Sequence, residues 1–188
     1  MSADSSSAEA LGLAVLQSLQ HSFKASKSLA DRALAQLAAA EWLHEPAPGS
    51  NSAAVIVQHV AGNLRSRFTD FLSTDGEKPS RQREREFDAP AAAAAIPALQ
   101  AEWEAAWQVL FDTLAGLAPA DLLRTVTIRH EPHTVLQALQ RQVAHYSTHA
   151  GQLVQLAKII RGNEFVSLSI PRGHSDQFNQ QKRDAASK

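Results

Sequence analysis

The sequence predicts an all-α protein that folds as one domain. Three long segments carry apolar residues at three- and four-residue steps, the spacing that gives a helix one apolar face. They are residues 8–42, 52–72 and 133–161, and a shorter stretch of the same kind covers residues 91–115. A chain of 188 residues is long enough to bury a full hydrophobic core, and one domain is the expected organisation at this length.

The composition is that of an ordinary globular protein, with 44% hydrophobic and 20% charged residues. The formal net charge of −1 argues against binding to nucleic acid or to an anionic membrane. No signal peptide or membrane span is recognisable, which predicts a cytoplasmic protein. The absence of cysteine excludes disulfides, thiolate ligands and a cysteine nucleophile. A metal site in this chain must therefore use nitrogen and oxygen ligands.

The helix boundaries follow from local signals. The first segment, 8–42, has no proline and reads as one long helix or two in line. A proline- and glycine-containing break at residues 45–50 precedes the second helix, for which Ser50, Asn51 or Ser52 can act as the cap.

The second half of the chain contains one segment that is not helical in pattern. Residues 125–129 alternate β-branched side chains and look extended, although a lone extended segment does not make a sheet. Glu131 and Pro132 are expected to open the last helix, because proline is favoured at a helix start. Trp103 and Trp107, in the third helix, are expected to anchor the core.

Residues 73–90 form a long charged connection after the second helix. One interpretation is a mobile surface loop. The other is a lid over a cleft, in which charged loop residues contact an acidic or polar substrate. The candidates for such contacts are Glu77, Lys78, Arg81 and Arg83.

Histidines on two helices provide the strongest chemical signal. His145 and His149 are four residues apart, so a helix projects both from one face, one turn apart, where they can bind one metal ion. This spacing also arises by chance in a histidine-rich chain. His59 lies at the border of the apolar face of the second helix, and a border histidine is usually a surface or hydrogen-bonded core residue. Buried polar groups on two facing helices could nonetheless satisfy one another through a metal ion. His130 and His133 beside Pro132 share no stable helix face and are expected at the surface.

These motifs resemble a known family. His59 within residues 51–64, together with His145-x-x-x-His149-x-Gly151-Gln152, resembles the DinB-like four-helix superfamily, which includes YfiT-type metal-dependent hydrolases. Residues 66–78 and 167–173 resemble one uncharacterised branch of it. The resemblance covers nearly the whole chain after the first few residues.

The resemblance implies an up-down-down-up four-helix bundle, here with the long charged loop after the second helix and an extended C-terminal tail. It implies that His59, His145 and His149 bind a divalent metal, most often zinc or nickel, with iron or manganese as further candidates. Some relatives are transferases or isomerases that act on a small thiol, others are assigned as hydrolases, and several form homodimers. The resemblance therefore implies a small thiol or another small substrate for this chain, and a homodimer. Residues 163–180 are expected to extend over the helices as a cover, with Arg172 and His174 not acting as ligands.

Two functional hypotheses follow. In the first, the chain is a metal-dependent enzyme, a thiol-dependent transferase or a hydrolase, whose metal activates a thiol or water. Asp70 and Glu131 are too distant along their helices to serve as a general base. Residues near the ligands would hydrogen-bond to them or orient a substrate, and the candidates are Asn63, Gln142 and Gln152. In the second hypothesis, the metal stabilises a noncatalytic bundle that acts in binding or dimerisation.

The expected domain comprises residues 9–180. Residues 1–8 and 181–188 are small, polar or charged, and are expected to be disordered.

Overall fold

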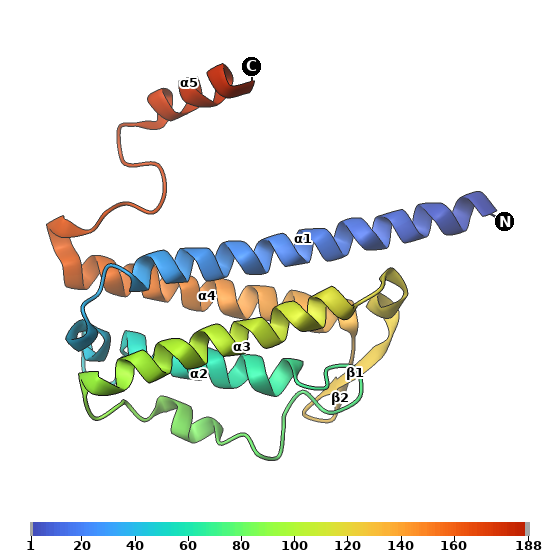
Figure 1. Cartoon of the computed structure of the whole chain (residues 1–188), viewed down its shortest axis with the longest axis horizontal. Helices are drawn as coiled ribbons and strands as arrows, with labels where there is room; N and C mark the ends of the chain where they lie inside the picture. Colours follow the sequence, from blue (N-terminus) through green and yellow to red (C-terminus); the bar gives the residue numbers. More distant parts are fainter. Residues whose placement is uncertain (1, 187–188) are drawn as a thin grey trace.

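The computed structural model describes residues 2–186, and side chains from residue 6 to residue 186. The prediction of a mainly helical protein is confirmed. Figure 1 shows α1 lying along α4, and α2 along α3, with α1 and α4 running toward the end where the C-terminal tail leaves. The helices of the described chain are α1 (Ser2–Leu34), α2 (Ala53–Phe68), α3 (Ile96–Gly116), α4 (Val135–Arg161) and α5 (Ser175–Ala186).

Side-chain caps define where α2 and α4 begin. The hydroxyl of Ser52 accepts a hydrogen bond of 3.3 Å from the backbone N–H of Val55. Thr134 and Gln137 form a reciprocal pair, in which the threonine hydroxyl accepts from the Gln137 N–H and the glutamine carbonyl accepts from the Thr134 N–H. Both arrangements satisfy N–H groups that have no partner inside the helix.

The ends of α1 differ from the prediction of a helix over residues 8–42. The helix begins at Ser2 and ends at Leu34, and Ala39–Leu43 form a separate 3-10 turn. Residues 2–8, for which the sequence predicts disorder, belong to the first turns of α1. Residues 1, 187 and 188 lie outside the described chain, and the domain limits at 9 and 180 stay predictions.

A β-hairpin precedes α4, where the sequence predicts only one extended segment. Strand β1 (Thr125–Ile128) pairs antiparallel with β2 (Glu131–Thr134). The expectation that Glu131 and Pro132 open the last helix was wrong, because both lie in β2. The turn places Arg129 and His130 at φ 55° and 65°, a left-handed conformation that usually requires glycine or asparagine. Without those residues, the turn leaves no signature in the sequence.

Aromatic rings pack between the helices in the centre of the core. Tyr146 on α4 contacts Trp107 on α3 and Phe23 on α1, with ring centroids 5.3 and 6.0 Å away. Its hydroxyl donates a hydrogen bond of 2.9 Å to the side-chain oxygen of Asn63 on α2. Trp103 is also buried, so the expectation that both tryptophans belong to the core is confirmed. This packing fixes the spacing of α2 and α4 at the level of the histidines.

Within the described chain, the hydrogen bonds between the C-terminal tail and the bundle come from the first part of the tail. Gln36 exchanges two hydrogen bonds with the backbone of Val166, and Arg32 donates one to the carbonyl of Leu168. Helix α5 is exposed and stands apart from the bundle in Figure 1, so the expected cover over the helices does not extend to it. None of the helices in the described part of the chain combines the length and apolar character that a membrane span requires.

Candidate metal centre

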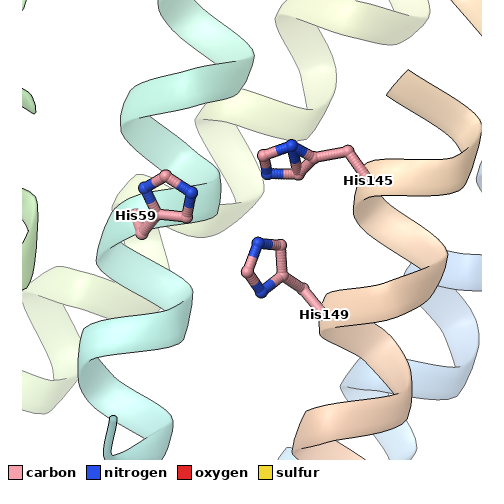
Figure 2. A group of neighbouring side chains, drawn as sticks. All are labelled: His59, His145 and His149. Atoms are coloured by element: carbon pink, nitrogen blue, oxygen red, sulfur yellow. The ribbon is translucent and has the colours of Figure 1, made fainter. Parts of the chain in front are cut away.

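Three histidines from two helices meet on one side of the core. His59 projects from α2 toward His145 and His149 on α4 (Figure 2). One ring nitrogen from each residue lies within 4.8 Å of the others. The centroid distances are 5.4 Å for His59 to His145, 5.1 Å for His59 to His149 and 4.7 Å for His145 to His149. The residues singled out in the sequence thus form one cluster.

The hydrogen bonds of the rings leave one nitrogen of each available to an ion. His59 Nδ1 lies 2.9 Å from a carboxylate oxygen of Glu86, and His149 Nδ1 lies 2.8 Å from the side-chain oxygen of Gln152. Both oxygens are acceptors, so both Nδ1 atoms carry the proton and the two Nε2 atoms have free lone pairs. Nε2 of His145 is buried without a partner. The donor set therefore fits a metal ion.

The protonation state of the cluster also suits a metal. Burial, followed by the charges of His149 and His59, lowers the pKa of His145 to about 4. Burial likewise lowers the pKa of His149, although the hydrogen bond with Gln152 opposes this. Imidazoles bind metals in the neutral form, which these two hold at neutral pH.

The grouping of the nitrogens is close to what a bound ion requires. Metal–nitrogen bonds of about 2.1 Å in a tetrahedron separate neighbouring ligand atoms by about 3.4 Å. The separations here do not exceed 4.8 Å, so no more than a small movement of the rings brings all three nitrogens to one ion. Three protein ligands leave one position of a tetrahedral ion for another molecule.

Glu86 is the site residue that sequence reasoning missed. It lies in a 3-10 turn, Arg83–Phe87, within the charged loop, and its side chain is buried against His59. Arg81 donates two hydrogen bonds to the same carboxylate, at 2.7 and 2.8 Å. Burial raises the pKa of Glu86, but the bonds from His59 and Arg81 lower it more, so the net pKa is below its ordinary value. Only Phe87, an aromatic residue in a charged run, hinted at this packing; its ring stacks on His59 at 4.9 Å.

The charged loop packs on α2 instead of standing free in solvent. Glu77 accepts hydrogen bonds from Arg67 on α2, from Arg81 and from Arg129 in the hairpin turn. The side chains of Arg67 and Arg81 are only 5% and 4% exposed. Four loop residues were candidates for contacting a substrate from a lid. Glu77 and Arg81 belong to this network, and Lys78 donates a separate hydrogen bond to the carbonyl of Asp75.

The three residues expected beside the ligands lie in different surroundings. Gln152 contacts His149, as described above. Asn63 binds Tyr146 instead of a histidine. Gln142 is buried, and its side-chain oxygen has no partner. Asn63 and Gln142 both line a small cavity beside His59 and His145.

The residues that the sequence analysis rejected as ligands or general bases lie outside the histidine cluster. Asp70 and Glu131 are exposed, as are His174 and Arg172 in the tail. His130 is 98% exposed at the hairpin turn. His133 departs from the surface position expected for it, because it is half-buried with an unpartnered Nε2.

A model of a protein family described as "Protein of unknown function (DUF1572)" matches residues 10–174. The chain belongs to the DUF1572 family. The matched region contains α2, α3 and α4, and with them all three histidines, but excludes α5. No curated protein and no solved structure matches significantly. DUF1572 is a DinB-like family, in agreement with the resemblance seen in the sequence, whereas the YfiT-type placement stays a prediction.

Two glycines of this DUF1572 chain are expected to respond oppositely to alanine. A Cβ at Gly62 on α2 would lie 2.8 Å from the carboxyl carbon of Glu86, whereas one at Gly151 on α4 would meet nothing within 4 Å. Gly62→Ala should lower the free energy of unfolding by about 1–3 kcal/mol, because it displaces a clamped carboxylate. Gly151→Ala should raise it by about 0.5–1 kcal/mol through helix propensity. Urea unfolding of both variants measures this, and a gain in stability at Gly62 would contradict the close packing of Glu86.

Proposed function

We propose that the chain is a metal-dependent enzyme in which Nε2 atoms of His59, His145 and His149 bind one divalent ion. The observation that carries the proposal is the arrangement of hydrogen bonds at the cluster. Glu86 and Gln152 hold the rings of His59 and His149 with Nε2 unpartnered, as carboxylates and amides do for metal-bound histidines. Zinc and nickel suit three imidazoles, and iron or manganese are further candidates.

The chemistry expected at this site is activation of a thiol or of water. A divalent ion with an open position supplies Lewis acidity, which lowers the pKa of a bound thiol or water toward neutrality. The carboxylate nearest to the ligands, Glu86, has a lowered pKa and is occupied by His59 and Arg81. It is therefore a poor general base, which favours transfer of a thiol over hydrolysis. Asn63 and Gln142, beside the histidines, would orient the substrate.

The fold and the family support a DinB-like interpretation. In Figure 1, α1 and α4 run in one direction and α2 and α3 in the other, the order expected for an up-down-down-up bundle. The alternative is a noncatalytic bundle whose metal serves stability or dimerisation. Three ligands argue against it, because structural zinc sites usually have four.

The test of metal binding is elemental analysis of the untagged protein, together with calorimetric titration of the chelator-treated protein with zinc, nickel, iron(II) and manganese. We expect close to one ion per chain, and its loss in His149→Ala. His21→Ala, which removes an exposed histidine of α1, is the matched control and should retain the ion. A wild-type protein that cannot be loaded with any of the four metals would refute the site.

Cobalt substitution separates the two functional classes. Small thiols should change the visible spectrum of the cobalt protein if a coordination position is open. A spectrum that responds to neither thiols nor small anions would favour the structural alternative.

A further inference from the structure

A cavity of about 180 Å³ opens beside the histidine cluster, and its wall is strongly cationic. His59 and His145 form one part of it, and Asn63 and Gln142 contribute amides. No acidic side chain is among the lining residues. Five arginines complete the lining: Arg67, Arg81, Arg83, Arg129 and Arg141.

These arginines come from four separate parts of the chain. Arg67 lies on α2, Arg81 and Arg83 in the charged loop, Arg129 in the hairpin turn and Arg141 on α4. Gathering like charges around one small space is unfavourable unless anions compensate them. The fold nonetheless brings all five together, which indicates that an anion completes the site.

The carboxylates of the protein compensate this charge only in part. Glu77 pairs with Arg67, Arg81 and Arg129, while Glu86 pairs with Arg81. The exposed Glu84 pairs with Arg83. Arg141 forms no ion pair within the described chain. Five guanidinium groups thus face three carboxylates, which leaves an excess of positive charge at the cavity.

Two buried polar atoms of the cavity wall also lack partners. Arg67 is 5% exposed, and its Nε has no acceptor although its Nη1 binds Glu77. The side-chain oxygen of Gln142, on the opposite helix, is also unpartnered; it is an acceptor, so an oxyanion leaves it unsatisfied, and only the amide nitrogen of Gln142 can donate to the anion. A buried donor without an acceptor costs about 1–3 kcal/mol. An oxyanion in the cavity would supply the acceptor that Arg67 Nε lacks.

We propose that this cavity binds a small oxyanion, the carboxylate or phosphate group of the substrate. Guanidinium groups bind both kinds of group through paired N–H donors. A cavity of 180 Å³ is below the usual range for a whole ligand, about 300–1,000 Å³, and therefore suits the anionic end of a larger molecule. Because His59 and His145 line the same cavity, the anchored molecule places its reacting group at the histidine cluster. The assignment of this anion as a substrate group rests on the proposed function.

Anion binding itself is testable without metal or activity. The chelator-treated protein is titrated by calorimetry with inorganic phosphate and, separately, with acetate, at constant ionic strength. We expect saturable binding of at least one of them, and a loss of at least tenfold in affinity for Arg141→Gln. Arg141 is exposed and forms no ion pair with any described residue, so this variant should remain folded. Lys158→Gln, an equal change of charge at an exposed position of α4, is the matched control and should bind like the wild type.

The outcomes separate this inference from the proposed function. Preference for phosphate assigns the cavity to phosphoryl groups, and preference for acetate assigns it to carboxylates; both support the inference. Absence of binding, or equal binding by the wild type and Arg141→Gln, overturns it even if the protein binds metal. If the protein binds the anion but takes up no metal, the oxyanion cavity is supported and only the metal centre is refuted.

Discussion

Replacing Glu86 with alanine is expected to lower the free energy of unfolding by about 3 kcal/mol, because it breaks a buried ion pair from one side. Arg81, only 4% exposed, would lose the two hydrogen bonds that it donates to Glu86 and would keep only its ion pair with Glu77. The same change removes the acceptor that orients His59, so affinity for a divalent ion should fall by about 10- to 100-fold. Urea unfolding of the metal-free protein gives the first quantity, and competition with a chromophoric chelator gives the second.

Two further variants serve as controls for the Glu86→Ala result. Glu86→Gln retains the shape and one oxygen acceptor, and should weaken both properties less than alanine does. Glu84→Ala removes an exposed carboxylate of the same turn, and should change stability by less than about 0.5 kcal/mol. If Glu86→Ala behaved like Glu84→Ala in both measurements, the contact with His59 would have no energetic role.

Asp75→Ala is expected to lower the free energy of unfolding by about 3 kcal/mol at neutral pH. The Asp75 carboxylate accepts three backbone hydrogen bonds, from Glu77 at 2.7 Å and from Arg129 and His130 at 2.8 Å. Hydrogen bonds to a charged group contribute about 1.5–3 kcal/mol each and do not add fully. Two of these bonds, from the N–H groups of Arg129 and His130, stabilise the left-handed turn of the hairpin. Thermal or urea unfolding measures the loss.

The contribution of Asp75 should depend on pH. Burial raises the pKa of its carboxyl, but the bonds from Glu77, His130 and Arg129 lower it more, so the net pKa is well below the ordinary value. A group with a lowered folded pKa stabilises the protein above its unfolded pKa of about 3.9, and this contribution is lost as the pH falls below that value. The advantage of the wild type over Asp75→Asn should therefore shrink by up to about 1 kcal/mol from pH 7 to pH 3, since solvent screens part of the effect. An advantage that is constant over this range would contradict the assigned hydrogen bonds.

The long helices were predictable because their signals are local. Apolar periodicity located α2, α3 and α4, and Ser52 was recognised as one of three possible caps for α2. The spacing of His145 and His149 placed both on one face, since helix geometry alone determines this. The end of α1 at Leu34 was not predictable, because the apolar pattern continues to Trp42, which is buried in the separate turn.

The hairpin and the loop were inaccessible to such reasoning because their stability comes from distant contacts. Pro132 resembles a helix start, and only its pairing with Thr127 makes it part of a strand. Arg129 and His130 adopt left-handed conformations without glycine, held by a carboxylate more than fifty residues earlier in the chain.

For the candidate site, the sequence by itself determined that a metal would meet only nitrogen and oxygen donors, and that two histidines share one face of α4. It also placed His59 at the border of an apolar face. Only the tertiary structure decided that Glu86 would reach His59 and that five arginines would surround the neighbouring cavity. The physical reason is that spacing along a helix specifies a face, whereas contact between faces depends on how helices pack and where a long loop returns. Glu86 is 27 residues from His59 in sequence, yet its carboxylate oxygen lies 2.9 Å from the ring nitrogen.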